Sequence, residues 1–124
     1  MDAVVAAHSG IRWLVLVALV ATVVVGFMRS SREESPTDRW LTWVGVLFGI
    51  QVLLGVILYI FNQGWDQGGF IAVYHPIGMI LAIAIFNMGT GRGRKTGGGA
   101  GWRTIAIMTL VSLVLVLAAI PWQR

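Results

Sequence analysis

Four long apolar stretches fill most of this sequence and leave only short links between them. They lie at about residues 9–28, 40–61, 75–91 and 102–120. A helix needs about 20 apolar residues to cross the hydrocarbon core of a bilayer, and the first, second and fourth stretches have this length. The third is shorter, but short links join it to its neighbours, so we count it as spanning too. Because lipid cannot satisfy backbone groups, each stretch is predicted to be a helix.

The composition supports a membrane protein. Only 11% of the residues are charged and 57% are hydrophobic, whereas soluble domains carry about 25% charged residues. A soluble fold would lack enough polar side chains to cover its core. The sequence therefore predicts an all-α integral membrane protein, in which residues 1–124 form one antiparallel four-helix bundle.

The basic residues predict the orientation of this bundle. Seven of the nine Lys and Arg residues occupy the first and third links between the stretches: Arg29, Arg32, Arg39, Arg92, Arg94, Lys95 and Arg103. Cytoplasmic loops of membrane proteins carry an excess of such residues. We therefore expect both basic links in the cytoplasm and both termini on the outer, periplasmic side of a bacterial inner membrane. The net charge of +4 then reflects orientation, and the expected partners are lipid and other membrane subunits, not nucleic acid.

Small residues predict how the chain packs and bends. Gly45 with Gly49, and Gly78 with Ala82, have the four-residue spacing that lets helices approach closely. The second pair follows a histidine, where small side chains would also leave room for a flat macrocycle. The glycine-rich stretch 89–101 is interpreted as a flexible linker.

Two histidines are predicted to lie at the same depth. His8 directly precedes the first apolar stretch, and His75 precedes Pro76, a residue favoured in the first turn of a helix. The first and third helices both run inward from the outer side, so the two imidazoles should be level. Paired histidines can hold haem iron as axial ligands. The alternative is that each is a helix-end histidine bonded to a loop carbonyl.

Three further polar residues could belong to the same site. Ionisable and polar side chains within spans are costly, so a functional role is the first hypothesis for them. Arg12 follows His8 by four residues and shares its helix face; it could pair with a haem propionate, a quinone oxygen or a carboxylate, or snorkel to headgroups. Gln51 could bind a ligand or bond to another helix, and Tyr59 could line a pocket or belong to an interfacial aromatic belt.

Several chemistries find no support. The absence of cysteine excludes disulfides, thiolate metal sites and covalent haem attachment. The apolar stretches hold no Asp or Glu, whereas a small multidrug-type proton-coupled exporter requires a membrane carboxylate.

Four short motifs occur in order along the chain: His8-Ser9-Gly10-Ile11-Arg12-Trp13, Gln51 with Leu54-Gly55-Val56-Ile57-Leu58-Tyr59, His75-Pro76 and Ile120-Pro121-Trp122. Together they resemble a family of small four-helix bacterial membrane proteins described as cytochrome b-like. The resemblance implies that His8, Arg12, Gln51, Tyr59 and His75 form one site. Tyr74 departs from the pattern, which often has an acid before the His-Pro pair, so a proton-handling role for that position is in doubt.

The resulting hypothesis is a small b-type cytochrome-like protein. Haem b would lie between the first and third helices with His8 and His75 as iron ligands, and electrons would pass to or from quinone or a redox partner. The sequence does not decide whether the chain is itself an enzyme. The alternative function is a haem-free accessory subunit of a larger respiratory or photosynthetic membrane complex.

Overall fold

The computed structural model describes residues 2–31, 36, 39–66 and 68–120. Four long helices dominate it: α1 (Asp2–Arg29), α2 (Arg39–Phe61), α3 (His75–Thr96) and α4 (Gly98–Ala119). A 3-10 turn, η1 (Gly64–Asp66), and a π-helical turn, η2 (Phe70–Tyr74), connect α2 to α3. The described residues contain no strand, so the predicted all-α class is confirmed for them.

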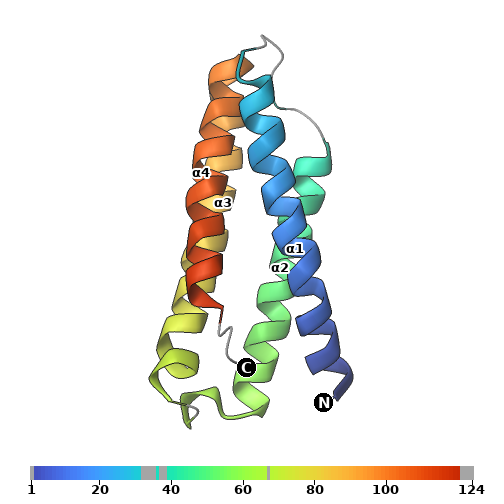
Figure 1. Cartoon of the computed structure of the whole chain (residues 1–124), viewed down its shortest axis with the longest axis vertical. Coiled ribbons are helices and arrows are strands. Elements are labelled where there is room, and N and C mark those ends of the chain that lie inside the picture. The colour runs from blue at the N-terminus through green and yellow to red at the C-terminus, as the bar shows by residue number, and fades with distance from the viewer. Residues whose placement is uncertain (1, 32–35, 37–38, 67, 121–124) are drawn as a thin grey trace.

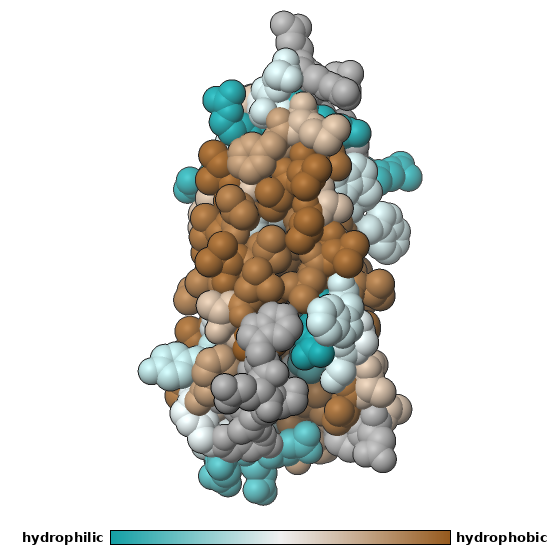
Figure 2. All heavy atoms as spheres, in the orientation of Figure 1, coloured by the Kyte–Doolittle hydropathy of each residue, from teal (hydrophilic) through white to brown (hydrophobic). Residues whose placement is uncertain are grey.

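All four helices are long and apolar enough to cross a membrane. The spans are Ala3–Arg29, Arg39–Phe61, Ala72–Thr96 and Gly98–Ala119. The π-helical turn η2 continues directly into α3, so the third span is longer than the apolar stretch 75–91 seen in the sequence. Many large apolar side chains point outward, among them Val17 at 67% exposure and Leu53 at 58%. Figure 2 shows a broad apolar band across the middle of one face with polar residues at both ends, as lipid contact requires.

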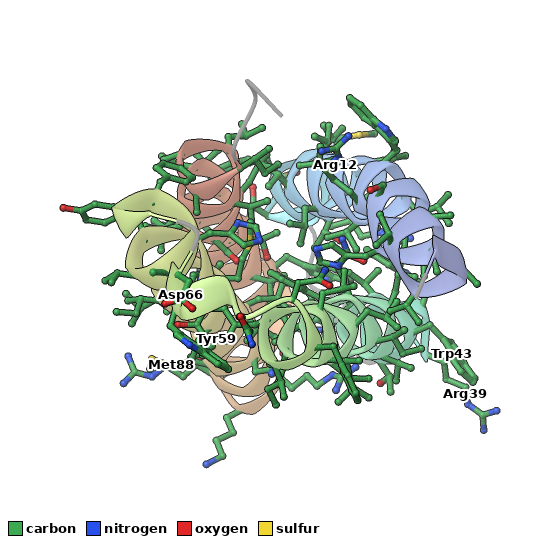
Figure 3. All side chains as sticks on the ribbon, turned by 90° about the horizontal axis from the view of Figure 1, so that it is seen from below. Arg12, Arg39, Trp43, Tyr59, Asp66 and Met88 are labelled. Atoms are coloured by element: carbon green, nitrogen blue, oxygen red, sulfur yellow. The ribbon has the colours of Figure 1, made fainter. Side chains whose placement is uncertain are left out.

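The helices lie side by side and alternate in direction (Figure 1). The start of α1, the α2–α3 connection and the end of α4 share one end of the bundle, which we call the terminal end; the other two links occupy the opposite end. In cross-section α1 packs against α2 and α4, and α3 packs against the same two helices. Helices α1 and α3 share no comparable interface and lie diagonally across the bundle (Figure 3).

The core is displaced toward the end opposite the termini and toward the α3–α4 pair. Phe48 and Phe86 meet at its centre with ring centroids 6.0 Å apart, surrounded by buried aliphatic side chains such as Leu19 and Val116. Closer to that end, Trp102 is fully buried and stacks on Trp40. Because these large side chains lie toward the opposite end, the terminal end is less densely filled. The polar residues gather at the terminal end.

Two sequence predictions need correction. Helix α1 begins at Asp2, not near residue 9, because Ala3–Ala7 continue the apolar helix; His8 therefore lies two turns inside α1. The stretch 89–101 is not a flexible linker, since it is helical except at Gly97, whose φ of 73° makes the turn between α3 and α4.

Close helix packing explains why these glycines are helical. A Cβ atom at Gly93 or Gly101 would collide with the other helix, so the missing side chains let the two backbones touch. The tight packing of α3 on α4 offsets the poor helix propensity of glycine.

Candidate functional site

A cavity of about 670 Å³ opens at the terminal end between the helices. It has the size of typical cofactor and ligand sites. All five residues singled out in the sequence line it, together with apolar side chains of all four helices. The structure thus brings together His8 and Arg12 from α1, Gln51 and Tyr59 from α2, and His75 from α3.

His8 and His75 lie close together across the diagonal of the bundle. Their ring centroids are 6.4 Å apart and the ring planes are nearly perpendicular, at 86°. Metal–imidazole bonds of about 2 Å on either side of one ion place two ring centroids about 6 Å apart. The centroid separation of His8 and His75 is close to this value.

The hydrogen bond of His75 assigns the roles of its two nitrogens. Its Nδ1 lies 2.7 Å from the carbonyl oxygen of Ala119, near the end of α4. A carbonyl can only accept, so Nδ1 carries a proton, and in the neutral imidazole Nε2 then keeps a lone pair. The alternative interpretation is a helix-end histidine bonded to a loop carbonyl. His75 does begin α3 and does bond a carbonyl through Nδ1, but the carbonyl belongs to the last residue of α4. In the neutral ring the other nitrogen keeps the lone pair that a metal requires.

His8 sits against the backbone of α2. A Cβ atom at Gly55 would lie 3.1 Å from the Cε1 atom of its imidazole, so glycine at this position makes room for the ring. The Nδ1 atom of His8 is buried and has no hydrogen-bond partner. A buried polar atom left unpaired costs free energy, which a ligand in the cavity would recover.

Gln51 and Arg12 each keep an unpaired polar atom near the cavity. The amide Nε2 of Gln51 donates to the backbone oxygen of His8 at 2.7 Å, so the interhelical role considered for this residue is confirmed. Its Oε1 atom is buried without a partner, as is Nε of Arg12. The guanidinium carbon of Arg12 lies 4.9 Å from the ring centroid of Trp13, a cation–π contact on the same helix.

Tyr59 connects the end of α2 to the turn before α3. Its hydroxyl donates to the backbone oxygen of Ala72 at 2.8 Å. Its ring packs edge-on against Trp65 and directly over Gly64, where a side chain would collide with it. Tyr59 therefore lines the cavity and also fixes the segment that presents His75.

The predicted role of Gly78 and Ala82 beside a macrocycle is wrong. Gly78 instead touches Ala119 of α4, and the backbone oxygen of Ala82 accepts a hydrogen bond from Ser112 at 2.6 Å. Both residues therefore belong to the α3–α4 contact. The glycine that makes room beside a histidine is Gly55, which lies on the face of α2 shared by Gln51 and Tyr59 because the three are spaced by four residues.

The donor set suits a cofactor that brings most of its own ligands. Among the described residues no three His, Cys, Asp or Glu side chains come together to hold a metal ion. Two imidazoles are enough for the axial positions of a metal whose remaining ligands belong to a macrocycle.

The chain was also compared with known proteins. It matches no protein-family model, no curated protein and no solved structure.

Proposed function

We propose that this chain is a small b-type cytochrome-like membrane protein that binds one haem b between α1 and α3. The observation that supports it is the pair His8 and His75, 6.4 Å apart on diagonally opposed helices and facing a cavity of about 670 Å³. The resemblance to cytochrome b-like four-helix proteins points the same way. Haem iron, when bound, would exchange single electrons with quinone or a redox partner.

The residues of the cavity have distinct roles in this proposal. His75 would hold the iron through Nε2, while the Ala119 carbonyl accepts a hydrogen bond from Nδ1–H; such a partner fixes the ring and raises ligand basicity. His8 would supply the second imidazole. Arg12 offers positive charge to a propionate, or a donor to a quinone oxygen, through its unpaired Nε. Gln51 ties α2 to the backbone of His8 and so keeps α1 in register.

Gly55 and Gly49 provide a matched test. Gly55→Leu places a side chain against the imidazole of His8, whereas a Cβ atom at Gly49 on the same helix meets nothing within 4 Å. We expect Gly55→Leu to weaken haem binding at least about tenfold, the effect of about 1.4 kcal/mol, and Gly49→Leu to leave it unchanged. The measurement is a haem titration of detergent-purified protein followed by absorbance. Equal affinity in the two variants would show that haem does not enter this cavity.

We also propose that the terminal end faces the periplasm of a bacterium and that the basic links face the cytoplasm. The support is the positive charge at the opposite end, where Arg94 and Lys95 form the last turn of α3. Because the chain lacks cysteine, single cysteines report sidedness directly. In intact cells stripped of the outer membrane, Asp66→Cys should react with an impermeant thiol reagent and Thr96→Cys should not. The reverse labelling pattern would invert the topology.

A further inference from the structure

We infer that Gly78 is a positioning residue for His75: its missing side chain lets the end of α4 come close enough for the Ala119 carbonyl to hold the imidazole. The inference rests on the proposed function, because a fixed imidazole matters most for an axial ligand. The sequence pattern predicts that Gly78 leaves room for a macrocycle, whereas in the structure Gly78 contacts Ala119 of α4.

The geometry couples the two contacts directly. Gly78 follows His75 by three residues and so lies on the same face of α3. A Cβ atom on Gly78 would lie 2.6 Å from the Cβ atom of Ala119 and 4.0 Å from its Cα atom. The same residue, Ala119, provides the oxygen 2.7 Å from Nδ1 of His75. Any side chain at Gly78 must therefore push away the acceptor that orients the ring.

The position of Ala119 in its helix makes its carbonyl suitable for this role. It is the last residue of α4, where helical carbonyls lack a partner within the helix. Its side chain is buried, at 6% exposure. Earlier along the same helix, Ser112 donates to the Ala82 oxygen. The α3–α4 contact is thus close along its length, and its last hydrogen bond is the one to His75.

For the neutral imidazole, the consequence is a defined tautomer with a lone pair on Nε2 before any cofactor binds. A histidine free to rotate would populate both tautomers and several ring orientations. Preorganisation of the ligand by a carbonyl partner both strengthens metal binding and favours the oxidised iron by raising ligand basicity. We therefore expect loss of the partner to raise the midpoint potential of bound haem.

A three-variant cycle tests the coupling. Gly78→Ala introduces the collision, and Ala119→Gly removes the opposing Cβ atom. In the double variant the new Cβ atom at position 78 therefore has space. Gly49→Ala, with open space around its new Cβ atom, is the control. The first readout is the ¹⁵N NMR spectrum of the histidines in the haem-free, full-length protein. The second is the midpoint potential of the haem-loaded protein.

We expect the wild type, Ala119→Gly, the double variant and Gly49→Ala to show the Nδ1–H tautomer of His75 with one potential. Gly78→Ala should show mixed tautomers and a higher potential. An Nε2–H tautomer in the wild type, an unchanged Gly78→Ala spectrum, or a double variant that resembles Gly78→Ala would overturn the inference. Should Gly78→Ala fail to fold, Ala119→Val makes the same collision from α4 and is expected to give the same change. If no haem binds, the proposed function fails. The NMR spectra of the haem-free variants still decide whether Gly78 positions His75.

Discussion

Replacing either His8 or His75 with alanine should abolish the low-spin spectrum of bound haem. Six-coordinate low-spin iron needs both axial ligands, and the two imidazoles come from different helices, so neither can substitute for the other. The sharp α-band of the reduced protein is expected to disappear in each variant. Asn87→Ala, an exposed change on α3, should retain the wild-type spectrum.

Added imidazole separates a lost ligand from a lost fold. The space vacated by an alanine variant adjoins the cavity, so free imidazole can enter it and restore the sixth ligand. We expect recovery of the low-spin band at millimolar imidazole in both variants. A wild-type spectrum in His8→Ala or His75→Ala without imidazole would remove that histidine from the site.

The largest expected loss of stability follows Gly101→Leu. A side chain at this buried position in the first turn of α4 would run into the backbone oxygen of Gly93 on α3, and backbone cannot move aside as a side chain can. Overpacking of this kind costs about 3 kcal/mol. Loss of this close helix–helix contact should appear as a lower midpoint in unfolding by sodium dodecyl sulfate or heat.

Gly91→Leu is the matched control. Gly91 lies near Gly93 on α3, but it is exposed and a Cβ atom there meets nothing within 4 Å. Leucine has better helix propensity than glycine, by up to about 1 kcal/mol, so this variant should be as stable as the wild type or slightly more stable. Equal losses in Gly91→Leu and Gly101→Leu would show that the α3–α4 contact contributes no special stability.

The sequence predicted the helices because hydrophobicity decides where a membrane helix forms. The five polar residues predicted to share a site all line one cavity in the structure. Their common function stays a prediction. For His8 and His75, the useful signal was that both were predicted to lie at the same depth in the membrane. The start of α1 was less predictable, because Ala3–Ala7 are apolar but too few to reveal a boundary.

Which helix a small residue faces could not be predicted. Gly78 and Gly55 both lie near chemistry-bearing residues in the sequence, and only the three-dimensional arrangement shows that the first touches α4 and the second touches His8. The glycines of 89–101 have the composition of a linker, and their helical state depends on the partner helix rather than on local propensity. The acceptor for His75 comes from residue 119, too distant in sequence for any local pattern to reveal.

The most direct test of the haem proposal is the haem content of the wild-type chain purified from membranes in mild detergent. The proposal predicts one haem b per chain by pyridine haemochrome assay. It also predicts an electron paramagnetic resonance spectrum of low-spin ferric iron with two imidazole ligands, held by His8 and His75. A chain that is folded and helical, yet neither carries haem nor takes it up when haem is supplied, would contradict the proposal and favour a haem-free accessory subunit.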